Sequence, residues 1–286
     1  MDKFEKLRDM EAFTEAMFNH IFEFQQKLHP AWNAELPFDE RIKSLPLHYL
    51  VFSTADRDPK LCAPTVAPYY PLQEEMRKIA WYARRVAQQP LVCDIHCGNG
   101  FIGSLLAREG IKVMGVRDPE TRPNQIADFY DPVGYEIRSA KCTDIDFALD
   151  VAFSSWMPSG VNLTPEIVKH TPKLIVYIHT DHVNEETGAA QTGTPEAFTR
   201  LPARYKLIDA WSVVRPADMF YEIWPDLSHS IEETRHVKIY ADEPWHDLAY
   251  SAPTESSEVY DWEKELEVIN LALEAKSMLR ARGHRL

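Results

Sequence analysis

Two closely spaced glycines after a short apolar run are the residues most suited to chemistry in this sequence. The stretch Pro90–Gly103 reads PLVCDIHCGNGFIG, and Gly98 and Gly100 follow an apolar run that contains Asp94. Glycine has no Cβ, so the backbone can turn sharply there and approach a ligand closely. From Phe101 onward the sequence has the pattern of an amphipathic helix, whose first amides would point back at the turn. We therefore expect a ligand-binding turn between a buried strand and a helix.

The acidic residue before the glycines distinguishes two cofactors that such turns hold. The sequence GNGFIG at 98–103 fits the G-x-G-x-x-G pattern of dinucleotide-binding proteins, a pattern of low specificity on its own. A carboxylate at Asp94 would repel the pyrophosphate of NAD, whereas it can pair with the ammonium group of an amino-acid moiety. The turn therefore favours a cofactor that carries an amino acid.

Asp94, Gly98 and Gly100 together resemble motif I of the class I S-adenosylmethionine-dependent methyltransferases, in which an acidic residue precedes a G-x-G turn. The resemblance implies S-adenosylmethionine as the cofactor and methyl transfer as the reaction. The family usually has glycine two residues after the acid, and this chain has His96 there. An imidazole at this position would crowd or contact the methionine end of the cofactor, so His96 is counted among the expected cofactor-binding residues.

A charged run follows the second predicted strand, which spans residues 111–116. A carboxylate just beyond the second strand is where Rossmann-type proteins hold the ribose hydroxyls, because it can accept hydrogen bonds from both. We expect Asp118 in this role, with Glu120 as the reserve. Arg117 stands at the position where a methyltransferase often has the acid.

The expected adenine-binding turn follows a weak third strand at residues 135–139 and has the sequence TDID at 143–146. Its placement resembles the adenine-binding turn of the family. The resemblance makes the Asp144 carboxylate the acceptor for the adenine amino group and Ile145 an apolar surface against the ring. The alternative interpretation is two solvated aspartates in a loop.

A fourth predicted strand lies in the stretch 149–158, which reads LDVAFSSWMP and resembles the fourth strand of the family. In an open parallel sheet, ligands lie beyond the carboxyl ends of the strands near the switch in strand order. We therefore expect Ser154 at the cofactor and Trp156, a candidate catalytic residue, beside the transferable methyl group. The amino methyltransferases of the family often carry Asn or Asp followed by prolines and an aromatic residue here. SSWMP is not that motif, so the stretch indicates a position and no particular substrate.

Two histidines and an aspartate follow the fifth predicted strand, residues 172–179. His179 is the candidate general base or substrate hydrogen bonder, since the strand end faces the same cleft. His179, Asp181 and His182 also suggest a metal, with His229 as a further ligand from elsewhere in the chain. We expect no metal, because no third well-spaced ligand is visible near them. A purely structural loop is the remaining interpretation.

Composition limits the classes of partner and the compartment. The chain has 286 residues and a formal net charge of −13, which argues against a nucleic-acid partner because such proteins normally present a basic face. No long apolar run predicts a membrane span or a signal peptide. The four cysteines lack paired metal-ligand spacing, so reduced thiols in a cytoplasmic protein are expected. A homo-oligomer is compatible with the sequence.

The expected architecture is α/β: a Rossmann-like, seven-stranded, mostly parallel sheet with helices on both faces. Strands at 205–213 and 236–240 complete the sheet, and the resemblance places the last one antiparallel between the fifth and sixth. We divide the chain into an N-terminal helical and loop extension (1–71), a methyltransferase-like domain (72–243), and a C-terminal tail and helix (244–286). Long helices are expected at 3–28 and 257–282, and shorter ones at 72–87 and 123–130.

The function expected from these observations is methyl transfer from S-adenosylmethionine to an unidentified acceptor. A small polar metabolite is preferred over a protein as the acceptor, given the acidity of the chain and the aromatic residues around the site, among them Tyr221 and Trp224. A non-catalytic binding protein on a degenerate methyltransferase fold is the alternative. A nicotinamide-dependent oxidoreductase is a second alternative, against which Asp94 argues.

Overall fold

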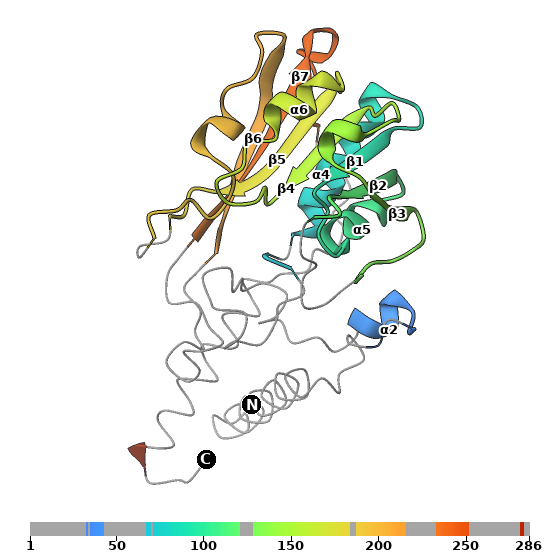
Figure 1. Cartoon of the computed structure of the whole chain (residues 1–286), viewed down its shortest axis with the longest axis vertical. Helices are drawn as coiled ribbons and strands as arrows, with labels where there is room; N and C mark the ends of the chain where they lie inside the picture. The colour runs from blue at the N-terminus through green and yellow to red at the C-terminus, as the bar shows by residue number, and fades with distance from the viewer. Residues whose placement is uncertain are drawn as a thin grey trace.

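A computed structural model describes residues 33, 35–42, 67–69, 71–120, 128–183, 187–215, 233–251 and 281–282 (Figure 1). The helix expected at 3–28 and nearly all of that expected at 257–282 lie outside the described residues. The aromatic-rich stretch with Tyr221 and Trp224, and His229 beyond it, lie outside them as well.

One seven-stranded sheet forms the centre of the described chain (Figure 1). Its strand order is β3-β2-β1-β4-β5-β7-β6, and β7 runs antiparallel to both of its neighbours whereas the other pairs are parallel. The expected fold class is therefore confirmed, including the place of the antiparallel strand. The strands are β1 (Leu91–Ile95), β2 (Lys112–Arg117), β3 (Tyr135–Ser139), β4 (Val151–Ser155), β5 (Leu174–Thr180), β6 (Tyr205–Arg215) and β7 (Glu233–Asp242).

Helices cover both faces of this sheet (Figure 1). Side chains of α4 and α5 belong to the apolar cluster on one face, and side chains of α6 and η3 belong to the cluster on the other. The α-helices are α2 (Phe38–Ile42), α4 (Gln73–Val86), α5 (Phe101–Ala107) and α6 (Thr164–Lys169); the 3-10 helices are η2 (Cys142–Asp144), η3 (Pro195–Phe198) and η4 (Glu243–Trp245).

The central strands are apolar along nearly their whole length because both of their faces are covered. Every residue of β5 is buried, and in β1 only Leu91 is partly exposed. In the register of the sheet, Ile95 of β1 lies opposite Ser154 of β4. The strand order reverses between β1 and β4, so the carboxyl ends of these two strands form the switch point at which a ligand is expected.

Parts of the predicted N-terminal extension share the core of the sheet domain. Phe38 of α2 packs against Phe101 with ring centroids 6.0 Å apart, and it lies 5.9 Å from Phe129. Ala67 and Tyr69 are buried in the same cluster as α4 and α5. The domain boundary at residue 71 stays a prediction, but these contacts attach the described parts of 1–71 to the sheet.

The short helix expected at 123–130 is wrong where the structure describes it. Residues 128–130 are not helical, and 121–127 lie outside the described residues. Asp128 has a left-handed φ of 43°, and the backbone N–H of Phe129 donates to the carbonyl of Asn99 at 2.9 Å. A tertiary hydrogen bond to the glycine turn thus replaces a helical one at this point.

Candidate cofactor site

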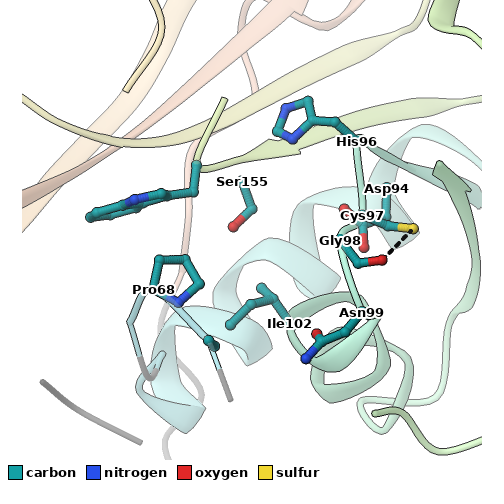
Figure 2. A pocket seen from close by; sticks show the side chains of 10 residues that line it. Pro68, Asp94, His96, Cys97, Gly98, Asn99, Ile102 and Ser155 are labelled. Carbon is teal, nitrogen blue, oxygen red and sulfur yellow. Dashed lines mark hydrogen bonds between the residues drawn. The ribbon is translucent and has the colours of Figure 1, made fainter. Parts of the chain in front are cut away.

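A cavity of about 140 Å³ lies at the carboxyl ends of β1 and β4, where the strand order reverses (Figure 2). The glycine turn forms one side of it, Ile102 of α5 forms part of the floor, and the residues after β4 form the opposite side. The segment 67–68 completes the wall. The ten lining residues are Ala67, Pro68, Asp94, His96, Cys97, Gly98, Asn99, Ile102, Ser155 and Trp156.

The two glycines of the turn serve different purposes. Gly98 and Gly100 both have a left-handed φ, 57° and 87°, which favours glycine. A Cβ on Gly100 would lie 2.8 Å from Tyr130 and 2.9 Å from Tyr135, so the protein itself occupies that space. A Cβ on Gly98 would have no heavy atom of the described residues within 4 Å. Gly98 therefore presents bare backbone to an open space in which a ligand can approach closely.

Asp94 lines the cavity but is almost completely buried, with 2% of its surface exposed. Its Oδ2 accepts a hydrogen bond from the hydroxyl of Tyr135 at 2.9 Å. Burial raises the pKa of Asp94 to about 7, and the Tyr135 hydrogen bond offsets part of that rise. The carboxyl group therefore titrates near neutrality and can gain a full negative charge when a cation approaches.

His96 occupies the position where the methyltransferase motif usually has glycine, and its φ of 52° is the left-handed conformation that favours glycine. Its Nε2 lies 2.9 Å from the hydroxyl oxygen of Ser154, so β4 holds the imidazole in place. Burial lowers the pKa of His96 to about 4. The ring is neutral at physiological pH, and it therefore does not repel a cationic group in the cavity that it lines.

The two acids expected to hold ribose, Asp118 and Glu120, both contact other groups of the protein. The Oδ1 of Asp118 accepts the backbone N–H of Glu120 at 2.8 Å, and the Glu120 carboxylate pairs with Lys141 at 2.8 Å. Neither acid lines the cavity. Arg117 turns back toward the glycines instead, and its Nη1 lies 3.3 Å from the carbonyl oxygen of Gly98.

The residues expected to hold adenine lie at η2 and just after it, next to α6, where the backbone carbonyl of Cys142 contacts Nε2 of His170 at 2.7 Å. Asp144 is exposed and accepts the hydroxyl of Thr143 at 2.8 Å, whereas Ile145 is buried in the apolar cluster under α6. Neither lines the cavity. Their contact with adenine stays a prediction.

Sequence reasoning missed Tyr69, which does not itself line the cavity but contacts two residues after β4 that do. The hydroxyl oxygens of Tyr69 and Ser155 are 2.7 Å apart, and the Tyr69 ring packs against Trp156 with centroids 5.1 Å apart. On its other side the ring faces the guanidinium of Arg235, which pairs with the buried Glu75. The aromatic and proline content near residue 69 was the only signal, and it did not indicate which strand the segment meets.

The two candidate catalytic residues are placed very differently. Trp156 lines the cavity, with a left-handed φ of 59° directly after β4. His179 does not line it: its ring stacks on Phe198 of η3, on the face of the sheet opposite α4 and α5, with centroids 4.1 Å apart. Oδ1 of Asp181 lies 3.6 Å from Nδ1 of His179. The rings of His179 and His236 have centroids 5.3 Å apart.

Within the described ranges, no group of three or more His, Cys, Asp or Glu side chains is arranged to hold a metal ion. The described helices include none with the length and apolar character needed to cross a membrane.

The site consists of a bare glycine turn, a buried carboxyl group, a neutral imidazole and an aromatic wall. This arrangement can bind a ligand with a cationic end and exclude water around it.

No family model and no curated protein matches the chain. Among solved structures it is similar to a putative RNA methyltransferase from Pyrococcus horikoshii, with 9% identity, a TM-score of 0.42, and coverage of 68% of this chain and 95% of that one. It is also similar to magnesium protoporphyrin IX methyltransferase from Synechocystis with bound SAH (12%, TM-score 0.41, 59% and 82%). A third is precorrin-6y C5,15-methyltransferase from Geobacter metallireducens (10%, TM-score 0.37, 68% and 98%).

These TM-scores and identities are too low to support a shared function. The fold assignment rests on the strand order of the chain itself, in which β7 lies antiparallel between β5 and β6. This is the order that the resemblance to class I methyltransferases implies.

Proposed function

We propose that the chain binds S-adenosylmethionine in the cavity at the glycine turn and transfers its methyl group to a small polar acceptor. The observation that carries this proposal is the cavity itself. At the switch point of a sheet with the methyltransferase strand order, it combines open backbone at Gly98 with the buried carboxyl group of Asp94. S-adenosylmethionine, when bound, supplies an electrophilic methyl group on a sulfonium.

The residues present fit such a cofactor. Asp94 has a carboxyl group that titrates near neutrality and can pair with the ammonium group of the amino-acid moiety. His96 is held neutral by burial, so its imidazole does not repel the sulfonium. The remaining task of the protein is to align donor and acceptor and to exclude water, which does not require a strong base.

The acceptor side of the cavity supports a small substrate. Trp156 and Pro68 line the cavity next to Ser155, and Tyr69 packs against Trp156. An aromatic and apolar wall of this kind suits a small molecule with few polar groups facing it. A protein acceptor is the second choice, and the identity of the acceptor awaits a screen.

The test is calorimetric titration of the purified chain with S-adenosylmethionine, S-adenosylhomocysteine (SAH) and NAD(H) in parallel. Micromolar binding of the two adenosyl ligands, without binding of NAD(H), is the expected result and justifies an acceptor screen. Binding of NAD(H) alone would move the proposal to a nicotinamide-dependent enzyme. If none of these ligands binds, the proposed function is overturned.

The second candidate is a non-catalytic binding protein on the same fold, and His96 is the observation that favours it. An imidazole in the position of a glycine reduces the space at the turn, and the bond to Ser154 holds it there. Such a protein would bind SAH weakly and show no turnover with any acceptor. Methyl transfer to any acceptor in the screen would rule it out.

A further inference from the structure

The end of β2 carries an arginine at the position expected for the ribose-binding acid, and this arginine contacts a different acid. Nη1 of Arg117 donates to Oδ1 of Asp128 at 2.6 Å and to the carbonyl oxygen of Gly98 at 3.3 Å. Because one nitrogen contacts both groups, the Asp128 carboxylate lies directly beside the glycine turn. An acid is thus present next to the glycine turn, outside the residues that line the cavity, and a different part of the sequence supplies it.

Asp128 is fixed in this place by contacts that do not involve its own carboxylate. Nη1 and Nη2 of the buried Arg41 donate to the carbonyl oxygens of Asp128 and Tyr130, at 2.9 Å and 3.0 Å. The backbone N–H of Phe129 donates to the carbonyl of Asn99 in the turn at 2.9 Å. These bonds hold Asp128 at a φ of 43°, which a non-glycine residue seldom adopts unless its surroundings impose it.

The Asp128 carboxylate retains capacity to bind a ligand. Its side chain is 54% exposed, and among the described residues only Arg117 contacts it, through Oδ1. A carboxylate oxygen accepts more than one hydrogen bond, and among the described residues no partner contacts Oδ2 of Asp128. Asp118 also uses only Oδ1, for the N–H of Glu120, but it lacks the link through Arg117 to the glycine turn, and Glu120 pairs with Lys141.

We propose that Asp128 accepts the hydrogen bonds of the ribose hydroxyls of an adenosyl ligand, and that Arg117 is the positioning residue that aims its carboxylate at the glycine turn. The proposal deepens the proposed function and rests on it. A vicinal diol donates two hydrogen bonds, and a carboxylate held by a guanidinium on one oxygen can accept them without losing its orientation.

A ribose with a 2′-phosphate is the competing ligand, because an arginine near the end of the second strand accommodates that group in NADP-binding proteins. The charge arrangement argues against it here. Arg117 is already paired with Asp128, and the half-exposed Asp128 carboxylate would repel a phosphate at the same place. The pair as a whole is neutral and suits a neutral diol.

The central comparison of the test uses two ligands and three forms of the full chain in calorimetric titration, and Arg117→Ala, Asp118→Asn and NADPH are added to it. The ligands are SAH and its analogue with a 2′,3′-dideoxyribose, and the proteins are wild type, Asp128→Asn and the matched control Asp247→Asn. Asp247 is an exposed acid beyond β7, so its substitution removes the same charge. We expect wild type and Asp247→Asn to bind SAH roughly 10- to 100-fold more tightly than the dideoxy analogue.

In Asp128→Asn this preference for the ribose hydroxyls is expected to disappear, so that both ligands bind as weakly as the analogue binds to wild type. Arg117→Ala is expected to reduce this preference partly. A general loss of stability would not reduce it, because it would weaken the binding of both ligands equally. A preference retained in Asp128→Asn, or lost in Asp118→Asn, would overturn the proposal while leaving the proposed function intact. Tighter binding of NADPH than of SAH would overturn it in favour of Arg117 as a phosphate-binding residue. A wild-type chain that binds neither adenosyl ligand would overturn both proposals.

Discussion

The hydroxyl of Tyr135 donates a 2.9 Å hydrogen bond to the buried carboxyl group of Asp94, and so connects the edge strand β3 to the end of β1 beneath the glycine turn. Two glycines make room for this contact. A Cβ on Gly103 would lie 2.1 Å from Oδ2 of Asp94, and a Cβ on Gly115 would lie 2.3 Å from the Tyr135 hydroxyl. The charge of the cofactor site is therefore governed by a contact inside the protein as well as by the ligand.

Binding of SAH is expected to depend on pH through Asp94. The pKa of this group in the free protein is about 7, and an ammonium group in contact with it favours the ionised form. Binding therefore releases a proton, and affinity rises about tenfold from about pH 6 to about pH 8. Calorimetric titration in buffers of different ionisation enthalpy measures both effects. Asp94→Asn should bind SAH weakly with a flat pH profile, and a flat profile in the wild type would contradict the assignment.

Tyr135→Phe is expected to move this pH profile upward. The hydrogen bond from Tyr135 lowers the pKa of Asp94, so its removal raises that pKa and shifts the midpoint of SAH binding to higher pH. The variant also leaves a buried oxygen without its donor, which lowers the free energy of unfolding by roughly 1–3 kcal/mol.

The matched control for this variant is Tyr205→Phe. The hydroxyl of Tyr205 is also buried and donates to the carbonyl of Pro172 at 2.9 Å, away from the cavity. Denaturant unfolding should show a comparable loss of stability in both variants, whereas the pH midpoint should shift only in Tyr135→Phe. Equal midpoints in the two variants would show that Tyr135 does not act through Asp94.

The centre of the sheet was readable from the sequence because its strands are separate, largely apolar runs, as buried parallel strands covered on both faces are. Residues 135–139 form β3 as predicted. Ser154 contacts His96 but does not line the cavity, so its contact with the cofactor stays a prediction. The partners of the site were not readable, because they come from distant segments. Tyr135 and Asp94 are 41 residues apart in sequence, and Tyr69 and Ser155 are 86 apart.

The separation of interacting residues in sequence also explains why the acid next to the glycine turn was not predicted. Local pattern offers Asp118 and Glu120, which are adjacent to the strand end, and the structure engages both elsewhere. Asp128 lies in a stretch whose pattern suggested a helix. Tertiary contacts of Arg41, Arg117 and the backbone of Phe129 place it beside the turn.

Gly98 of the turn and Gly103 of α5 should respond differently to substitution by alanine. Gly103→Ala brings a Cβ to 2.1 Å from Asp94 and 2.5 Å from Tyr135, so the packing must shift, and we expect a loss of roughly 1–3 kcal/mol in the free energy of unfolding. In Gly98→Ala the Cβ meets nothing within 4 Å, and the cost is roughly 1–2 kcal/mol of backbone strain from its positive φ.

SAH titration separates the two effects. Gly98→Ala places a methyl group where the ligand approaches the backbone, so SAH affinity should fall by more than its stability does. Gly160→Ala is the control, since Gly160 also has a positive φ with nothing within 4 Å and does not line the cavity. If Gly98→Ala and Gly160→Ala have the same small effect on binding, the cofactor does not approach the turn at Gly98.

His96→Gly tests whether the imidazole is a contact or an obstruction. Glycine relieves the left-handed strain at φ 52° and restores the residue that the motif usually has, but it also removes the bond to Ser154. If His96 touches the cofactor productively, we expect SAH affinity to fall about tenfold or more. Tighter binding in the variant would identify His96 as an obstruction and strengthen the reading of the chain as a degenerate methyltransferase.

His179 should make the fold sensitive to acid. Burial lowers its pKa to about 4, and Lys238 and His236 add to the effect whereas Asp181 opposes it. The folded state therefore keeps the ring neutral at pH values where the unfolded chain, with an ordinary histidine pKa of 6.5, already binds a proton. Stability contributed by the neutral ring is present above about pH 6.5 and is lost as the pH falls toward about 4, by up to roughly 3 kcal/mol.

The variant that isolates this group is His179→Phe, which keeps a ring to stack on Phe198 and removes two buried nitrogens that have no hydrogen-bond partner among the described residues. Denaturant unfolding from about pH 7 to about pH 4 should show a shallower fall in stability for the variant than for the wild type. His96 titrates in the same window and is present in both proteins, so the difference between the two curves belongs to His179. Parallel curves would mean that the ring takes up its proton in the folded state as readily as in the unfolded one, and the packing against Phe198 would then not exclude the charged form.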